Sequence, residues 1–393
     1  MVLNSTANPE QSLKSAAHAA ELPTNKGPRP RVAFCWAYNS GYMAACFRTM
    51  HRRNQIDLLV STFKPDSVSD HEFTNNLMAG VPSIAFPAAA FSANSPDKIA
   101  FYDRLAAHKP EIAVICGWAF PTLTELAFDS RFEGIKLVMG MDTPYLGTLR
   151  QRLGRFARRR LFDRVDHVFV TGERCWQLAR ILGFPEDKIT RGVYGIDFNQ
   201  FAPLWDQRAA LPGGWPKQFL YIGRYIDFKA IDKMLAAYAE YRAAVKDPWP
   251  LICMGHGPLA KMVEAAPGVT NLGYLHPLEQ NEHILRSGVS LLASRFDPWP
   301  LVVVESCAAG LPIICTEACG SAIELVRNFH NGRIVPTDNV KAFSTAMLWM
   351  HRNHDLLPEM GRRGRDFAAA YSAERWTDRW SNVFFELLGR RPT

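Results

Sequence analysis

Two carboxylates stand in an apolar segment of the second half of the chain. In the stretch SRFDPWPLVVVESCAAGLPIICT (residues 294–316), Asp297 precedes Glu305 by eight residues, and the neighbours of Glu305 are mostly apolar. A buried carboxylate without a partner is costly, so each must be paired, exposed in a cleft or used to bind a ligand. A glutamate in such a place can accept two hydrogen bonds from a diol, such as the hydroxyls of a ribose.

The residues around Glu305 predict the element that positions it. VSLLA (289–293) and LPIICT (311–316) have the pattern of buried strands, whereas Pro300 suits the first turn of a helix and Gly310 its C-terminal cap. We therefore expect a helix over 300–309 between two parallel strands.

Three consecutive valines (302–304) locally favour a strand instead, and they are the main argument against this helix. If the helix forms, Asp297 lies in a loop at the carboxyl edge of the sheet, where open α/β sheets bind ligands. The free N–H groups from Leu301 to Val303 would then point toward the same crevice.

Short apolar runs alternate with longer amphipathic segments along most of the chain. The runs that predict buried strands are RVAFCW, IDLLVSTF, IAVICGW, IKLVMG and DHVFVTG, and then FLYIGR, PLICMG, VSLLAS and LPIICT. Continuous apolar strands that alternate with helices are typical of parallel sheets covered on both faces. The sequence therefore predicts an α/β fold with doubly wound sheets.

The length of 393 residues exceeds what one hydrophobic core usually supports, so we expect more than one domain. We divide the chain into a flexible N-terminal tail (1–29), a first domain (30–197), a linker (198–216), a second domain (217–370) and a final helix (371–393). The linker contains prolines and paired glycines and has no strand pattern. The final helix is amphipathic, and we expect it to pack back on the first domain.

The composition is that of an ordinary globular enzyme, with 48% hydrophobic and 21% charged residues. A formal net charge of +7 suits an anionic ligand or an acidic membrane surface, but it is too small to indicate nucleic-acid binding. No apolar run is long enough to span a membrane, and the N-terminus lacks the pattern of a secretory signal. The eight cysteines form no Cys-x-x-Cys pair, which favours free thiols in the reducing cytoplasm over disulfides or a metal site.

The segment GHGPLA (255–260) formally fits a dinucleotide-binding fingerprint. Pro258 at the helix start and the absence of an acidic residue at a strand end about 20 residues later argue against this interpretation. We interpret the segment as a tight strand-to-helix turn near a ligand.

Taken together, these motifs resemble those of retaining GT-B glycosyltransferases, specifically glycosyltransferase family 4. The segment Asp297–Glu305 is similar to the Glu-x7-Glu motif of the family, and Tyr221–Arg224 followed by Lys229 is similar to its diphosphate-binding Gly-Arg and Lys pair. Two further stretches, 320–335 and 170–197, agree in order and spacing.

The resemblance implies a GT-B fold, with two doubly wound Rossmann-like domains facing each other across a cleft. It also implies transfer of a sugar from a UDP- or GDP-sugar to a hydroxyl acceptor with retention at the anomeric carbon, without a metal or other cofactor. The diphosphate would be bound by Arg224 and Lys229, and the ribose by Glu305. The residues that it assigns to donor binding are Gly223, Arg224, Lys229, His276, Asp297, Pro300, Leu301, Val302 and Glu305.

Three departures from the family pattern leave the donor sugar open. Asp297 stands where the family usually has Glu, Trp299 and Pro300 replace its common Gly-Phe-Gly surroundings, and Tyr194 stands at the position of a frequent Asn. We expect the donor preference to be decided near Asp297.

The first domain would supply the acceptor site. Asn39, Ser40 and Gly41 follow the first strand and resemble the glycine-rich acceptor loop of the family, with one glycine in place of two. Trp118 follows a later strand, near a position where relatives often have a histidine. Asp142 ends the next strand, and its carboxylate could accept a proton from the acceptor, bind the donor sugar or simply cap the following helix.

The densest basic stretch is Arg150–Arg164. Leu149, Leu153, Phe156 and Leu161 keep helical spacing within it, which predicts an amphipathic helix with an arginine-rich face. Such a face is either solvated or bound to anionic lipids or a phosphorylated acceptor.

Two other functions stay open at this point. One is a GT-B sugar-nucleotide epimerase or hydrolase without an acceptor, and the other is a non-catalytic, membrane-associated protein that binds a nucleotide sugar. For the transferase, lipid-linked saccharides, polysaccharide precursors and small molecules are all candidate acceptors. We expect a cytoplasmic protein, with peripheral membrane contact if the basic helix binds lipid.

Overall fold

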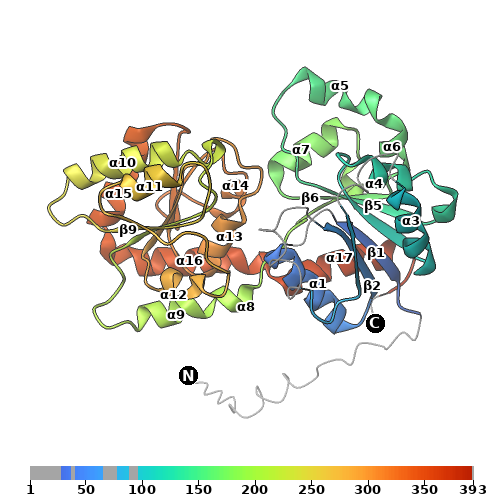
Figure 1. The fold of residues 1–393 in the computed structure, drawn as a ribbon, viewed down its shortest axis with the longest axis horizontal. Helices are drawn as coiled ribbons and strands as arrows, with labels where there is room; N and C mark the ends of the chain where they lie inside the picture. Colours follow the sequence, from blue (N-terminus) through green and yellow to red (C-terminus); the bar gives the residue numbers. More distant parts are fainter. Residues whose placement is uncertain (1–27, 37–39, 65–77, 88–95, 392–393) are drawn as a thin grey trace, which may run out of the picture.

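The structure is a computed structural model that describes residues 28–36, 40–64, 78–87 and 96–391. It contains two α/β domains side by side, coloured blue to green and yellow to red in Figure 1. Most of the expected N-terminal tail lies outside the described residues, and so does Asn39, one of the predicted acceptor-side residues.

The first domain is built around a sheet in which every pairing is parallel. Within the described residues it has seven strands in the order β3-β2-β1-β4-β5-β6-β7. They are β1 (Arg31–Trp36), β2 (Asp57–Lys64), β3 (Ser83–Pro87), β4 (Ile112–Cys116), β5 (Lys136–Met141), β6 (His167–Val170) and β7 (Ile189–Arg191). The strand order reverses between β1 and β4, so the sheet is doubly wound with a switch point there.

The second domain repeats this plan with a parallel sheet in the order β10-β9-β8-β11-β12-β13, as far as the described residues show. Its strands are β8 (Phe219–Ile222), β9 (Leu251–Met254), β10 (Val269–Asn271), β11 (Val289–Leu292), β12 (Ile313–Thr316) and β13 (Gly332–Val335). The switch point lies between β8 and β11. Each apolar run that predicted a strand forms one.

Helices pack against both sheets (Figure 1). In the first domain they are α1 (Gly41–Arg53), α3 (Asp97–Ala107), α4 (Pro121–Leu126), α5 (Leu149–Ala157), α6 (Arg159–Arg164) and α7 (Glu173–Ile181). The helices that follow are α8 (Phe198–Phe201), α9 (Pro203–Ala209), α10 (Ile231–Ala243), α11 (Ala260–Ala265), α12 (Gln280–Leu285), α13 (Leu301–Ala308), α14 (Ala322–Leu325), α15 (Val340–Arg352), α16 (Leu357–Ala368) and α17 (Ala373–Leu387).

The last helix, α17, packs on the first domain beside α1 (Figure 1). The indole N–H of Trp376 donates to the carbonyl of Val193 (2.7 Å), and the ring of Trp380 stacks on Phe169 with centroids 3.6 Å apart. These buried aromatic contacts fix α17 to the first sheet although it follows the second domain in sequence.

The chain crosses between the domains twice, and the two crossings are hydrogen-bonded to each other. The Ile196 N–H donates to the carbonyl of Tyr371 (2.9 Å), and the Ala373 N–H donates to the carbonyl of Ile196 (2.8 Å). Any movement of one domain relative to the other must therefore bend both segments together.

Two elements differ from what the sequence pattern indicates. Residues 198–216, expected to be a linker, include α8 and α9, whose buried side chains belong to the core of the second domain. The Arg150–Arg164 stretch, expected to be one helix, forms α5 and α6, because the backbone of Arg158 leaves helical geometry (φ −123°, ψ 18°).

Candidate functional site

The predicted donor residues gather at the switch point of the second sheet. Gly223 and Arg224 follow β8, and Asp297 lies in the loop after β11, the strand that pairs with β8. Carboxyl-terminal loops on either side of a switch point form the usual ligand crevice of an open α/β sheet.

Lys229 and Asp297 form an ion pair at this edge of the sheet. Lys229 ends a short 3₁₀ turn (Asp227–Lys229), and the loop of Asp297 is held by a backbone hydrogen bond from Gly320 (2.9 Å). The two side chains are only 18% and 12% exposed. The sequence indicated both residues separately, and the structure adds that they pair with each other.

The side chain of Arg224 is exposed and has no hydrogen-bond or ion-pair partner among the described residues. Its backbone is fixed, because the hydroxyl of Tyr221 donates to the Arg224 carbonyl (3.0 Å). A guanidinium on a fixed backbone without a protein partner is well suited to bind a phosphate group.

The turn at Gly255 and Gly257 supports this loop. A Cβ atom at Gly255 would overlap the carbonyl of Gly223, and the carbonyl of His256 accepts a 2.7 Å hydrogen bond from the N–H of Tyr225. The expectation of a tight strand-to-helix turn is therefore confirmed, and its glycines allow two neighbouring loops to pack closely.

Glu305 lies on α13 (Leu301–Ala308), which confirms the helix expected over 300–309. Its start after Pro300 and the positive φ (67°) of Gly310 beyond its end agree with the predicted boundaries. The valines are tolerated because Val303 and Val304 are fully buried in the core of the second domain.

Glu305 as a residue is only partly exposed, and its carboxylate has no partner among the described residues. Burial raises its pKa to about 7, well above the ordinary value of 4.5. An unpaired carboxyl group kept in such a position is available to hydroxyl donors of a ligand.

The other donor-side residues differ in their surroundings. Pro300 is buried, whereas Leu301 and Val302, in the first turn of α13, are partly exposed. His276 lies in the loop after β10, at the same edge of the sheet but beyond β9. Its side chain is exposed, and no described contact joins it to Arg224.

Trp299 lies in the contact between the domains. A Cβ atom at Gly172 of the first domain would overlap its ring, and the ring of Tyr371 lies 5.8 Å away. Next to this contact, the carboxylate of Glu324 accepts a 2.8 Å hydrogen bond from the N–H of Glu173 at the start of α7.

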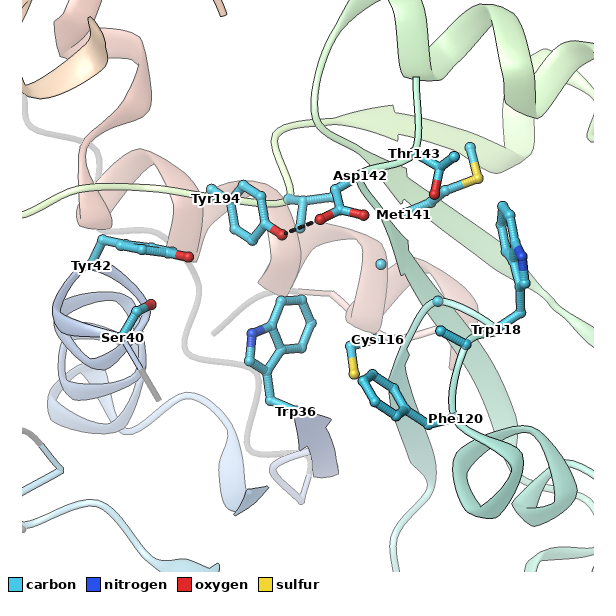
Figure 2. Close-up of a pocket in the computed structure, with 14 residues that line it drawn as sticks. Trp36, Ser40, Tyr42, Cys116, Trp118, Phe120, Met141, Asp142, Thr143 and Tyr194 are labelled. Carbon is cyan, nitrogen blue, oxygen red and sulfur yellow. Dashed lines mark hydrogen bonds between the residues drawn. The ribbon is translucent and has the colours of Figure 1, made fainter. Parts of the chain in front are cut away.

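A cavity of about 290 Å³ lies at the switch point of the first sheet (Figure 2). It is lined from the ends of β1, β4 and β5, from the start of α1 and from the turn after β7. Ser40, Trp118 and Asp142, three of the predicted acceptor-side residues, line this cavity together.

The carboxylate of Asp142 accepts a 3.0 Å hydrogen bond from the hydroxyl of Tyr194 (Figure 2). The pKa of Tyr194 lies well above its usual value, through burial and the nearby charge of Asp142, so this hydroxyl remains a donor. Asp142 does not cap a helix, because α5 begins at Leu149 and Thr148 caps it. The capping interpretation was therefore wrong.

Ser40 and Gly41 lie at the start of α1, beside the cavity. Ser40 precedes the helix, and its hydroxyl is buried beside the side chain of Tyr42. A Cβ atom at Gly41 would meet nothing within 4 Å, so there is free space beside the helix start.

Trp36 and Tyr42, two of the aromatic residues that the sequence did not single out, also line the cavity. Trp36 ends β1 and packs on Gly140, where a Cβ atom would come within 3.0 Å of its ring. Tyr42 packs against the cores of both domains, and its pKa is raised by burial and by the charges of Asp142 and Glu305. Tyr42 thus lies between the two switch-point sites. Its position directly after Gly41, in the predicted acceptor loop, could have identified it as a site residue from the sequence.

Among the described residues, no group of three or more His, Cys, Asp or Glu side chains is placed to hold a metal ion. In the same part of the chain, no helix is long and apolar enough to cross a membrane. All eight cysteines are free thiols, as expected.

Comparison with known proteins is consistent with this architecture. Residues 206–367 match the family model described as "Glycosyl transferases group 1". The chain is 25% identical over 191 residues to an exopolysaccharide phosphotransferase of Streptomyces coelicolor, which covers 47% of this chain and 20% of that protein. It is 27% identical over 247 residues to a D-inositol 3-phosphate glycosyltransferase of the same organism, covering 53% of this chain and 54% of that protein. The chain thus spans less than two thirds of the length of these relatives.

Solved structures support the fold. The structure is similar to that of HepE from Anabaena in complex with UDP and glucose, with a TM-score of 0.70 and 13% identity over 91% of this chain and 100% of that one. The predicted GT-B fold, with two doubly wound parallel α/β domains, is confirmed.

Proposed function

We propose that this chain, whose residues 206–367 match the glycosyl transferases group 1 family model, transfers a sugar from a nucleotide diphosphate sugar to a hydroxyl acceptor. The observation that carries the proposal is the group of residues at the switch point of the second sheet. There the Lys229–Asp297 pair, the unpartnered Arg224 and the partly exposed Glu305 lie on the loops and helix at the carboxyl edge of that sheet, where open α/β sheets bind ligands.

The donor would bind with its diphosphate on Arg224 and Lys229 and its ribose on Glu305. Binding of the diphosphate would compete with Asp297 for Lys229, which frees the Asp297 carboxylate for hydroxyls of the donor sugar. The two cations would stabilise the negative charge that develops on the leaving nucleotide, so the proposed reaction needs no metal. UDP is a candidate nucleotide because HepE was solved with UDP.

The acceptor would enter the first-domain cavity, near Asp142 and the hydroxyl of Ser40. In a retaining, same-face reaction the bond from the anomeric carbon to the phosphate oxygen breaks as the acceptor oxygen bonds to that carbon. The acceptor proton passes to the departing phosphate oxygen. In this scheme Asp142 positions the acceptor hydroxyl and no protein base is required.

We also propose that α5 contacts an anionic membrane surface from the cytoplasm. Three of its apolar side chains are exposed: Leu149, Leu153 and Phe156 are 73%, 60% and 77% exposed. Its polar side faces the protein, where Gln151 donates to the carbonyl of Pro144 (2.8 Å). An outward apolar stripe flanked by arginines fits a lipid interface better than water.

The experiment that tests the donor site is a calorimetric titration of the full chain with UDP and with GDP. Glu305→Ala and the double variant Arg224→Ala, Lys229→Ala should each lose binding of the nucleotide that the wild type binds, by about tenfold or more. Asp142→Asn is the matched control, because it removes a carboxylate from the first domain and should leave nucleotide affinity unchanged. Unaltered affinity in the donor-side variants would contradict the site.

Transfer is tested with the nucleotide sugar that binds, incubated with and without candidate acceptors and followed by NMR. The proposal expects a glycosylated acceptor with the anomeric configuration retained, and less of it with Asp142→Asn. Epimerised donor or free sugar in the absence of any transfer would favour the epimerase or hydrolase instead.

A further inference from the structure

A second cavity of about 710 Å³ adjoins the first. It lies among α5, α6 and α7, and Trp118 and Thr143 line both cavities. Its volume is within the range of roughly 300–1,000 Å³ that is usual for ligand pockets. A ligand bound in the first cavity could therefore extend past Trp118 into the second.

The floor of the second cavity is apolar, whereas its rim is basic. Phe162, Leu178 and Leu182 are buried and line it, and Arg150 and Arg158 are exposed and line it as well. No aspartate or glutamate lines this cavity.

The two arginines are not neutralised by the protein. Arg158 donates a long hydrogen bond (3.4 Å) to the carbonyl of Trp118, and Arg150 has no hydrogen-bond or ion-pair partner among the described residues. By contrast, Arg155 and Arg159 of the same basic stretch pair with Asp163. The rim thus leaves positive charge for an anionic group next to an apolar floor.

We propose that this cavity binds the alkyl chain of an amphiphilic acceptor that carries a phosphate-type group. The alkyl chain would lie on Leu178 and Leu182, the anionic group would contact Arg150 and Arg158, and the hydroxyl to be glycosylated would reach Asp142 past Trp118. The inference rests on the proposed function, because it takes the first cavity as the acceptor site, and it names a lipid-phosphate acceptor class.

The test uses n-decyl phosphate below its micelle concentration, titrated calorimetrically into the full chain without vesicles. Inorganic phosphate and n-decanol are the two comparison probes. We expect saturable binding of decyl phosphate, and affinity at least about tenfold weaker for each of the comparison probes, because each lacks one half of the interaction. Equal affinity for decanol would overturn the role of the arginines, and binding of inorganic phosphate alone would overturn the role of the apolar floor.

Two variants locate the binding site. A Cβ atom at Gly154 would lie 3.5 Å from Leu182, so Gly154→Phe should fill the cavity and abolish decyl phosphate binding. Leu149→Ser is the matched control, because it also changes α5 but does not line the cavity, and it should bind as the wild type does. Arg150→Gln, an exposed substitution that preserves packing, should weaken decyl phosphate at least severalfold without affecting decanol.

The nucleotide that the wild type binds, UDP or GDP, is titrated into every preparation as a measure of the donor site and of folding. Normal affinity for this nucleotide, together with undiminished decyl phosphate binding in Gly154→Phe, would refute the subsite and leave the proposed function intact. Absence of both UDP and GDP binding in the wild type would instead refute the proposed donor site.

Discussion

At the scale of single residues, the unusual group is the carboxyl of Glu305. An acid with a raised pKa is a cost to the folded protein, because the unfolded chain ionises it more readily. Lys229 and Asp297 pair with each other, whereas Glu305 has no partner among the described residues. A cost of this kind is expected where a group is kept ready for a ligand.

The stability of the protein should therefore depend on pH through Glu305. Its pKa is about 7 in the folded state against an ordinary 4.5, so the folded state binds more protons between these values. The contribution of Glu305 to the free energy of unfolding must then fall as pH rises from about 4.5 to about 7, and stay constant above. We expect Glu305→Gln to gain on the order of 2 kcal/mol relative to the wild type over this range, measured by urea unfolding. Parallel pH profiles for the two proteins would contradict the prediction.

At the scale of elements, the sequence predicts a helix or strand where the residues that mark its ends lie within it or beside it. It does not predict features that depend on contacts between distant segments. Pro300 and Gly310 mark the boundaries of α13 within its own sequence, so this helix could be predicted despite its valines. The short strands β7 and β10 have three residues each, too few for a clear apolar pattern.

Long-range contacts explain what the sequence could not predict. Residues 198–216 resemble a linker, yet Arg208 is fully buried and donates to the carbonyls of Ile284 and Ala309, both at 2.7 Å. The ends of β1 and β4 form one cavity only because those strands pair. A residue such as Trp36 can therefore be recognised as part of the candidate acceptor site only once the strand order is known.

The outward apolar stripe of α5 makes a second prediction. The double variant Leu149→Ser, Phe156→Ser should weaken binding to phosphatidylglycerol-containing vesicles by about tenfold or more, because each apolar side chain contributes about 1.5–3 kcal/mol when fully buried. Leu278→Ser, an equally exposed leucine of the second domain, is the matched control and should bind normally. Vesicle sedimentation at low and high salt measures the effect, and high salt should weaken the wild type through its arginines. Absence of wild-type binding at low salt would exclude the membrane contact.

At the scale of the whole molecule, the two sites must meet for a sugar to pass between them. The contacts that bring the domains together lie beside the sites: Trp299 on Gly172, and the Glu324 carboxylate on the N–H of Glu173. Both crossing segments are joined at Ile196 and Tyr371, so they provide a common hinge.

Gly172→Leu should hold the domains apart, because any side chain there would overlap the ring of Trp299. The backbone is extended at this glycine (φ −168°), which a leucine can adopt, and besides the Trp299 ring a Cβ atom there would come within 3.1 Å of the Glu324 carboxylate. We expect kcat for transfer to fall on the order of 10²-fold, because a small misplacement of the acceptor can cause a loss of this size, with UDP affinity nearly unchanged.

Trp299→Ala in the same chain should restore much of the lost kcat by removing the overlapping ring, whereas Trp299→Ala alone should lower kcat less than Gly172→Leu does. Because the two residues come from different domains, non-additivity in this double-mutant cycle would report on domain closure itself. If the two substitutions were simply additive, the contact between Gly172 and Trp299 would not control the reaction.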